Sequence, residues 1–488
     1  MANAARVPVA ETVDKLDPLA PMREQLRDSQ IPKKLEAHRA VRLEGEISAS
    51  PSKSYSHRAL MVAALCARPV VVENLLVSED IIATAHALIS LGADIRYDKE
   101  TRSLRVRGFS RPFENMVPGS STPPIFVNQS GTTLRFLLPG LSFARGTVRV
   151  KGKLSLKQRP NAMIVEPLRQ LGVDTRGKAP AYTVPLEVKG EGFLPAGDVL
   201  IRGSQSSQVV SAFLLWLPLA SSPRTLRNAI NRFIAPKRLV NSHIRVEGSL
   251  VSKPYVDITI DALRRWGGIV INEVEPGRHY SVPSGQQFRA MSDTFRVGGD
   301  YSSAAFILAA ATLCNANVLV KGLQRDEQGD RQIVPILVQM GANITETDEG
   351  IRVKGPASLT GIELDCASIP DLVPILSVLG TFARGRTVLR NISHLKHKES
   401  DRLVAPTEEL RKLGANISCT EDSITIEQSE LSSAKVSARH DHRLAMSLIV
   451  AGLASRGVEV DGAGCIVKSY PTFLIDMLHL GADIKPVA

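Results

Sequence analysis

The stretch LRKLGANI (residues 410–417) sets the pattern of this chain, because five other stretches repeat it. In each one an apolar helical run reaches a glycine, and a short β-like segment follows. The other copies are LISLGADI (88–95), LRQLGVDT (168–175), LRRWGGIV (263–270), LVQMGANI (337–344) and MLHLGADI (477–484). Glycine adopts the left-handed backbone conformation that ends many helices at low cost. We therefore expect a helix to end in this conformation at each of Gly92, Gly172, Gly267, Gly341, Gly414 and Gly481.

The spacing of these glycines predicts the architecture. They follow one another at intervals of 80, 95, 74, 73 and 67 residues, and the intervals hold strand-like runs such as TVRVKG (147–152) and VLIRG (199–203). Each repeat is therefore an α/β module, and six modules favour two domains of three modules each. A single barrel of eight α/β units ranks second because it needs shorter and more even spacing. The strands exclude a helical solenoid.

The charge and the aromatic content of the chain limit the classes of ligand that it is suited to bind. The chain has 488 residues, a formal charge of +11 and only 5% aromatic residues, and the basic residues form no continuous tract. This pattern favours small anionic substrates over nucleic acid. The five cysteines are scattered and lack CxxC spacing, so we expect reduced thiols in a cytoplasmic protein, without a disulfide or structural zinc.

The longest apolar run is not typical of a membrane-spanning helix, and the N-terminal segment is not typical of a signal peptide. Residues 209–220 are too few for the roughly 20 that cross a bilayer. Residues 1–38 mix acids, bases and prolines without the apolar core of a signal peptide. We expect them to form a flexible extension, with a short helix around residues 22–26.

Several helix starts in the first half carry small polar or basic residues. PSKSYSHR (51–58) opens an apolar helical run, where free N–H groups, Lys53 and Arg58 favour an anion. Similar starts occur in NQSGTTLR (128–135), at Arg159-Pro160, in SSQ (206–208) and in SKPY (252–255). Each alone is compatible with ordinary helix capping. Together they predict one shared site for phosphate and carboxylate groups.

The second half adds carboxylates to this set. Asp371 precedes an apolar helix, either as an ordinary helix-start carboxylate or as a general base. KESDRL (398–403) groups Lys398, Glu399 and Arg402, which could equally form a solvated ion-paired turn. RHDHRLAM (439–446) leads into another apolar helix, and Lys468 precedes the last one.

Four histidines in this half raise the question of a metal. His394, His397, His440 and His442 lack a carboxylate or thiolate at ligand spacing, so we expect no metal site.

In chain order, PSKSYSHR, SGTTLR, RP, SSQ, SKPY, PD, KESDRL, DHRLAM and KSYP resemble the motifs of the 5-enolpyruvylshikimate-3-phosphate synthase family. The resemblance covers about residues 41–484. It implies a two-domain inside-out α/β barrel with six βαβαββ modules and a two-stranded hinge near residues 49–51 and 298–300. The first domain would comprise residues 51–297, and the second residues 39–50 plus 298–488.

The resemblance also implies a reaction. Members of the family transfer the enolpyruvyl group of phosphoenolpyruvate to the 5-hydroxyl of shikimate-3-phosphate, releasing phosphate, without a metal or organic cofactor. Partners would be these two small molecules, and we expect a monomer that binds neither nucleic acid nor membrane. The implied catalytic residues are Asp371, Glu399 and Lys53.

The substrate contacts follow from the matched motifs. The implied ligands of shikimate-3-phosphate are Lys53, Ser54, Arg58, Ser206, Ser207, Gln208, Ser252, Asp371, His394 and Lys398. Those of phosphoenolpyruvate are Lys53, Gly131, Arg159, Gln208, Arg402, Arg443 and Lys468.

The chain departs from the family pattern at three places. Gln129 and His394 stand where the family often has asparagine, and a basic segment around residues 222–242 looks inserted. These departures put fine specificity and tolerance of analogues such as glyphosate in doubt.

Two alternatives stay open. One is the related enolpyruvyl transferase that acts on UDP-N-acetylglucosamine, which normally has a reactive cysteine in a mobile loop. The only cysteine in the expected first domain is Cys66, within an apolar helical run. The other is a non-catalytic anion-binding homologue.

Overall fold

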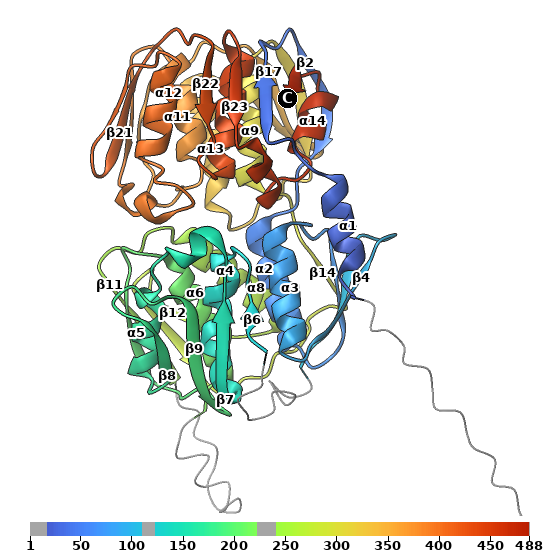
Figure 1. The fold of residues 1–488 in the computed structure, drawn as a ribbon, viewed down its shortest axis with the longest axis vertical. Helices are drawn as coiled ribbons and strands as arrows, with labels where there is room; N and C mark the ends of the chain where they lie inside the picture. The colour runs from blue at the N-terminus through green and yellow to red at the C-terminus, as the bar shows by residue number, and fades with distance from the viewer. Residues whose placement is uncertain (1–16, 110–122, 222–240, 488) are drawn as a thin grey trace, which may run out of the picture.

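The computed structural model describes residues 17–109, 123–221 and 241–487. They form two lobes, one above the other in Figure 1. The buried apolar side chains divide in the same way. One cluster contains Leu19, Met22 and residues between 55 and 297, and the other contains residues between 31 and 49 and between 301 and 484. The change from one cluster to the other falls near residues 50 and 298, apart from the N-terminal segment described below, and the expected domain limits stay a prediction. The basic segment that looked inserted lies mostly outside the described residues.

Within the described residues the strands form six four-stranded sheets, three in each lobe. The sheets of the first lobe are β14 (Thr294–Arg296), β3 (Val70–Glu73), β5 (Ser103–Arg107) and β4 (Asp94–Asp98); β6 (Ile125–Phe126), β7 (Arg145–Lys151), β9 (Thr183–Glu191) and β8 (Asp174–Lys178); and β10 (Asp198–Arg202), β11 (Asn241–Glu247), β13 (His279–Pro283) and β12 (Asn272–Glu275). Those of the second lobe are β2 (Leu43–Ser48), β15 (Ala316–Lys321), β17 (Gly350–Gly355) and β16 (Asn343–Thr347); β18 (Glu363–Asp365), β19 (Arg386–Arg390), β21 (Ser423–Glu427) and β20 (Ile417–Cys419); and β22 (Ala434–Ser437), β23 (Val458–Asp461), β1 (Lys34–Ala37) and β24 (Ile484–Pro486).

Every sheet has the same pairing pattern. One edge strand pairs in parallel with its neighbour, and the remaining two pairings are antiparallel, as in β2–β15, β15–β17 and β17–β16. The six sequence repeats therefore fold as six copies of one module.

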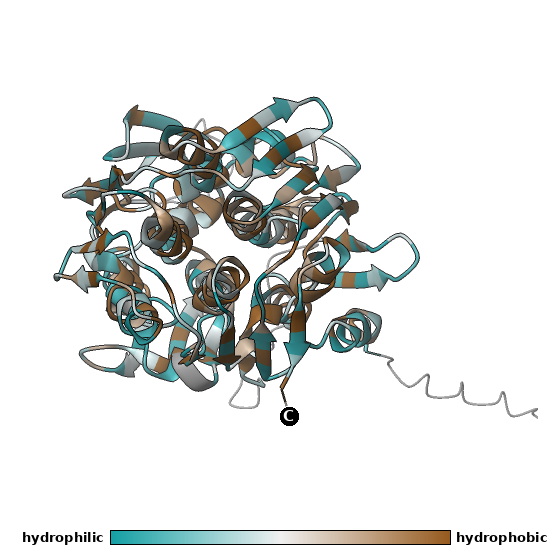
Figure 2. Ribbon diagram, turned by 90° about the horizontal axis from the view of Figure 1, so that it is seen from above, coloured by the Kyte–Doolittle hydropathy of each residue, from teal (hydrophilic) through white to brown (hydrophobic). Residues whose placement is uncertain are grey.

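The helices lie inside and the sheets outside. Figure 2 shows brown, apolar helices in the middle of the molecule, surrounded by strands. Besides α1, described below, the α-helices of the first lobe are α2 (Lys53–Leu65), α3 (Glu79–Ser90), α4 (Gly131–Leu137), α5 (Ala162–Gln170), α6 (Ser207–Trp216) and α8 (Pro254–Gly267). In the second they are α9 (Tyr301–Leu313), α10 (Ile333–Met340), α11 (Val373–Phe382), α12 (Val404–Lys412), α13 (His442–Ala454) and α14 (Phe473–His479).

Sequence explains which helices are central. In α9 all residues except Leu313 are buried, so the helix is apolar on every side and not amphipathic. Such a helix requires protein on all its faces. The two domains of three modules expected from the repeats, and the inside-out architecture implied by the resemblance, are confirmed.

The repeat glycines behave as expected at five of the six positions. Gly92, Gly172, Gly341, Gly414 and Gly481 have φ between 80° and 108°. Gly267 was assigned wrongly. It is the last residue of α8, and Gly268 after it takes the left-handed conformation with φ of 62°. The double glycine lets the helix continue one residue further.

The N-terminal segment differs from the flexible extension that we expected. Residues 1–16 lie outside the described residues, but α1 (Ala20–Asp28) packs on the first lobe, with Leu19 and Met22 fully buried. Strand β1 is hydrogen-bonded between β23 and β24 of the second lobe. Burial of these apolar side chains, together with the strand pairing, explains why the segment is folded.

The expected hinge lies where two chain passages meet. The Ser52 N–H donates to Gly298 O at 2.8 Å, and the Asp300 N–H donates to Ser50 O at 2.7 Å. No helix in the described ranges is both long and apolar enough to cross a membrane.

Candidate active site

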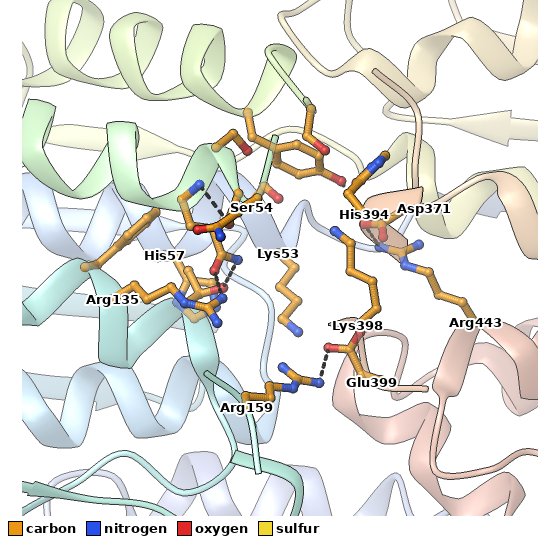
Figure 3. Close-up of a pocket in the computed structure, with 18 of the residues that line it drawn as sticks. Lys53, Ser54, His57, Arg135, Arg159, Asp371, His394, Lys398, Glu399 and Arg443 are labelled. Atoms are coloured by element: carbon orange, nitrogen blue, oxygen red, sulfur yellow. Dashed lines mark hydrogen bonds and ion pairs between the residues drawn. The ribbon is translucent and has the colours of Figure 1, made fainter. Parts of the chain in front are cut away.

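A cavity of about 140 Å³ lies between the two lobes. Figure 3 shows Lys53, Ser54, Arg135 and Arg159 reaching it from one side, and Asp371, Lys398, Glu399 and Arg443 from the other. The lining includes these predicted residues: Lys53, Ser54, Arg58, Arg159, Ser206, Ser207, Gln208, Ser252, Asp371, His394, Lys398, Glu399, Arg402 and Arg443.

The two remaining predicted residues lie beside the cavity. A Cβ atom on Gly131 would be 3.4 Å from Arg159 Nη1, which is van der Waals distance, so Gly131 lies directly against this guanidinium. Lys468 Nζ is 4.0 Å from Glu399 Oε1. All the predicted residues therefore come together at one place.

The start of α2 positions Lys53. Ser52 is the N-cap and accepts a hydrogen bond from the Tyr55 N–H at 3.5 Å. Lys53 Nζ lies 2.5 Å from Asp80 Oδ2, and this carboxylate is almost fully buried at the start of α3. Sequence reasoning missed Asp80 because an acid in the first turn of a helix is common.

Arg58 was predicted to bind shikimate-3-phosphate, but its guanidinium is largely hydrogen-bonded to protein groups. Its guanidinium donates to Thr259 Oγ1 at 2.7 Å and to the carbonyl oxygens of Tyr255 and Ser54 at 2.6 and 2.9 Å. Burial lowers its pKa to about 10. Arg58 lines the cavity, yet most of its donors hold α2 against α8.

The other first-lobe groups form a surface of donors. Ser206 caps α6 through the Gln208 N–H, and Gln208 Oε1 accepts from Arg135 Nη1 at 2.5 Å. The Nε atoms of Arg135 and Arg159 are buried without a hydrogen-bond partner among the described residues. Buried donors are rarely left unpaired, so these two are suited to an anionic ligand.

The second lobe supplies an ionic network centred on Arg402. Its Nε and Nη2 atoms donate to the two carboxylate oxygens of Asp441 at 2.7 and 3.1 Å. Nη1 donates to Asp371 Oδ1 at 2.6 Å, and Nη2 also reaches Glu399 Oε2 at 3.1 Å. Arg443 Nη2 lies 2.8 Å from Asp371 Oδ2. Each nitrogen of the Arg402 guanidinium thus donates to a protein carboxylate.

The network keeps both candidate catalytic carboxylates ionised. Burial opposes the charge of Asp371, but Arg443 and Arg402 outweigh it and hold its pKa below the usual range. Burial also opposes ionisation of Glu399, and Arg159, Arg402 and Lys468 hold the pKa of that carboxyl well below normal. Both groups can accept a proton.

Lys398 and His394 lie beside these carboxylates. Burial lowers the pKa of Lys398, although Asp371 opposes the shift. Burial and the charge of Lys398 lower the pKa of His394 to about 4, so its imidazole is neutral near pH 7. Both ring nitrogens of His394 are buried without partners in the part of the chain that is described. In a neutral imidazole one ring nitrogen donates a hydrogen bond and the other accepts one. His394 can therefore bind an acceptor and a donor on a ligand.

Contacts across the cavity join the lobes. Arg159 Nη2 is 3.3 Å from Glu399 Oε1, drawn as a dashed line in Figure 3. Tyr255 Oη donates to Asp371 Oδ2 at 2.7 Å. Tyr255 belonged to the SKPY motif, but its partner is more than a hundred residues away, so no local signal predicted the contact.

Metal ligation finds no support in the donor set. Among the described residues no three His, Cys, Asp or Glu side chains are grouped as a metal would need. Burial lowers the pKa of His442 to about 3. The expectation of a metal-free site stays a prediction.

Cys66 bears on the UDP-N-acetylglucosamine alternative. It is fully buried at the end of α2, and burial raises its thiol pKa to about 12. A thiol that is protonated and inaccessible is a poor nucleophile.

Comparison with known proteins identifies the same family as the motifs whose residues line this cavity. The family described as EPSP synthase (3-phosphoshikimate 1-carboxyvinyltransferase) matches residues 38–477. A 3-phosphoshikimate 1-carboxyvinyltransferase from Methanococcoides burtonii is 38% identical over 90% of this chain and 96% of its own length. One from Methanosarcina mazei is 37% identical over 91% of this chain and 97% of its own length.

Solved structures show the same likeness. EPSP synthase from Acinetobacter baumannii superposes with a TM-score of 0.74 and 26% identity, covering 93% of this chain and 99% of the other. The enolpyruvyl transferase NikO from Streptomyces tendae has a TM-score of 0.69 at 18% identity, covers 93% of this chain and 99% of its own, and shares the fold. On the extent of the family match and the identity to these relatives, the chain belongs to the EPSP synthase family.

Proposed function

We propose that this protein transfers the enolpyruvyl group of phosphoenolpyruvate to the 5-hydroxyl of shikimate-3-phosphate. The products are 5-enolpyruvylshikimate-3-phosphate and inorganic phosphate, as expected of a 3-phosphoshikimate 1-carboxyvinyltransferase. One observation carries the proposal in this chain. Donors of the first lobe face ionised Asp371 and Glu399 of the second across a single cavity.

The first step joins the two substrates. Asp371 takes the proton of the 5-hydroxyl, and the oxygen forms a bond to C2 of phosphoenolpyruvate while C3 gains a proton. The electron pair of the C2–C3 double bond forms the new C3–H bond. The result is a tetrahedral intermediate that still carries the phosphate.

The second step breaks the intermediate down. A proton leaves C3, its electron pair forms the C2–C3 double bond again, and the C2–O bond to phosphate breaks. Arg159 and Lys468 stabilise the charge that develops on the departing phosphate. Proton transfer at C3 falls to Glu399 and Lys53.

Substrate charge explains how Glu399 can act as an acid as well as a base. Arg159, Arg402 and Lys468 hold its pKa low. An anionic phosphoenolpyruvate beside the same cations offsets their charge and therefore raises the pKa of Glu399. The carboxyl then becomes easier to protonate in the complex than in the free protein.

Each substrate is assigned to its own set of predicted ligands. Shikimate-3-phosphate lies over Ser206, Ser207 and Ser252, with His394 and Lys398 at its ring. Phosphoenolpyruvate lies beside Gly131, Arg159 and Lys468. Arg402 acts mainly by positioning Asp371 and Glu399, because its donors already contact protein carboxylates.

Release of inorganic phosphate tests the proposal. The purified protein should release phosphate with phosphoenolpyruvate plus shikimate-3-phosphate, and none when UDP-N-acetylglucosamine replaces shikimate-3-phosphate. Turnover with the nucleotide sugar instead would support the alternative transferase. Binding of both substrates without phosphate release would indicate a non-catalytic homologue.

Quaternary structure and location complete the proposal. We assign a monomer, because both halves of the cavity come from one chain. All five cysteines are unpaired, and we assign the protein to the reducing cytoplasm on that ground.

A further inference from the structure

A second cavity, of about 470 Å³, lies at the boundary of the two lobes on the side of α1. Its walls come from α1, α3, the β6 region and Val467 of the second lobe. Figure 1 shows α1 beside α3 at this boundary. None of its lining residues contributes to the cavity of the proposed reaction. Its volume falls within the range of small-molecule sites.

The wall formed by α1 is firmly attached to the first lobe. Met22 is fully buried, the Tyr97 hydroxyl donates to Gln25, and Lys99 Nζ lies 3.0 Å from Glu24. The chain then crosses to the second lobe within a few residues. α1 ends at Asp28, and Ile31 is already buried in the second cluster. This third crossing, besides the two at the hinge, closes the cavity on one side.

The lining combines positive charge with apolar surface. Arg23, Arg27, His86 and Lys153 lie around the cavity, and Glu79 is the acid among its lining residues. Arg23 already pairs with Asp17 at 2.9 Å, whereas Arg27 has no ion pair among the described residues.

Apolar groups cover the remaining wall. Leu26, Ile82 and Val467 line it, and the ring of Phe126 is 37% exposed. Lys153 Nζ lies 5.4 Å from the centre of this ring. A cation above an exposed aromatic ring suits a ligand with both an anionic group and a flat apolar body.

We propose that this cavity binds a small aromatic carboxylate and that its occupancy is coupled to the relative position of the two lobes. The carboxylate lies near Arg27 and Lys153, and the ring packs against Phe126 and Leu26 of the first lobe and Val467 of the second. Two of the walls lead to residues that pair with lining residues of the first cavity. Glu79 precedes Asp80, the partner of Lys53, and Val467 precedes Lys468.

The coupling follows from these neighbouring walls and from the contact with both lobes. A ligand that contacts residues of both lobes binds one arrangement of the lobes better than another. Substrates that also contact both lobes must then change the affinity for that ligand, and the reverse.

Calorimetric titration of the full chain with 3-phenylpropanoate, benzoate and 4-hydroxyphenylacetate tests the site. At least one should bind saturably, at roughly millimolar concentration as is usual for so small a ligand. Arg27→Ala and Lys153→Ala should each weaken binding by about tenfold or more, as expected for a lost carboxylate partner. The matched control is Arg176→Ala, which removes an exposed arginine of β8 and should change nothing.

Three results would overturn the proposal. They are no saturable binding by any of the three compounds, equal binding by inorganic phosphate, or binding that neither variant weakens. For the coupling, shikimate-3-phosphate should change the affinity for the bound compound by about threefold or more, and an unchanged affinity would contradict it. Turnover of the two substrates without any added aromatic carboxylate shows that the variants are folded, and it tests the proposed function separately.

Discussion

The two faces of the active-site cavity differ in how their charges are held. On the first lobe, Lys53 pairs with the carboxylate of Asp80, but the arginines Arg58 and Arg135 are fixed mainly by hydroxyl, amide and carbonyl oxygens, which are neutral. On the second lobe, Arg402 and Arg443 are bound to the carboxylates of Asp371, Glu399 and Asp441. An arginine whose partners are neutral keeps its positive charge available to bind an anion. An ionic network makes each protonation state depend on its neighbours. The first face is therefore suited to binding and the second to proton transfer.

The largest effect should follow from removing the carboxylates of the second face. We expect Asp371→Ala and Glu399→Ala each to lower turnover by about a hundredfold or more, the usual scale for a lost acid or base. Steady-state kinetics measures this, and circular dichroism verifies folding. Glu363→Ala, an exposed acid of β18, is the control. Near-normal turnover in both variants would contradict the division between the two faces.

A smaller effect should follow from changing the shape of one cation on the second face. Arg443→Lys keeps the charge but loses the planar fork that can hold a carboxylate or phosphate by two hydrogen bonds. We expect it to raise the phosphoenolpyruvate requirement by about tenfold, equivalent to about 1.4 kcal/mol. Binding of shikimate-3-phosphate should change little.

Titration calorimetry with each substrate separates two roles for Arg443. A loss confined to phosphoenolpyruvate supports direct contact. A fall in turnover with both affinities preserved would instead show that Arg443 positions Asp371, its partner at 2.8 Å. Arg386→Lys, on an exposed position of β19, serves as the control.

A buried histidine of the first face, His57, leads to a prediction about how stability depends on pH. Burial and then Lys53 lower the pKa of His57 to about 3, from an ordinary value near 6.5. Between these values the unfolded chain binds the proton and the folded chain does not. The contribution of His57 to stability is therefore complete above about pH 6.5 and falls as the pH falls toward 3.

Replacing His57 with asparagine should remove this contribution. The free energy of unfolding of His57→Asn should depend less steeply on pH between 6.5 and 4, by at most about 1.4 kcal/mol per pH unit. Denaturant titrations at several pH values measure the slope. The exposed His479→Asn should keep the wild-type slope, and equal slopes for all three proteins would contradict burial of a neutral His57.

The smallest effect should come from a single contact between the faces. Tyr255→Phe removes the hydroxyl that donates to Asp371 at 2.7 Å while leaving Arg402 and Arg443 on the carboxylate. We expect turnover to fall by roughly two- to fivefold, since one hydrogen bond of several is lost. Tyr182→Phe, whose hydroxyl accepts from Arg169 far from the cavity, is the control. A loss as large as that of Asp371→Ala would mean that Tyr255 takes part in the chemistry.

The sequence by itself determined the module and most of the site. A glycine after each apolar helix, at near-regular intervals, predicted six modules because glycine ends helices for a local steric reason. The motifs at helix starts predicted one shared anion site, since a helix N-terminus presents donors wherever it points. These two signals are short-range properties, so the chain order alone was sufficient for them. The individual residues that meet at the cavity were implied by the resemblance of the same motifs to the family.

Only the tertiary structure decided the partners of the charges and the place of the N-terminus. Asp80 and Lys53, Tyr255 and Asp371, and Arg402 and Asp441 are pairs separated by tens of residues or more, and nothing local distinguishes them from solvated surface charges. Strand β1 has an unremarkable sequence, but it completes a sheet whose other strands come from the end of the chain. Pairing and burial of this kind depend on which segments the fold brings together, and that information is spread over the whole chain.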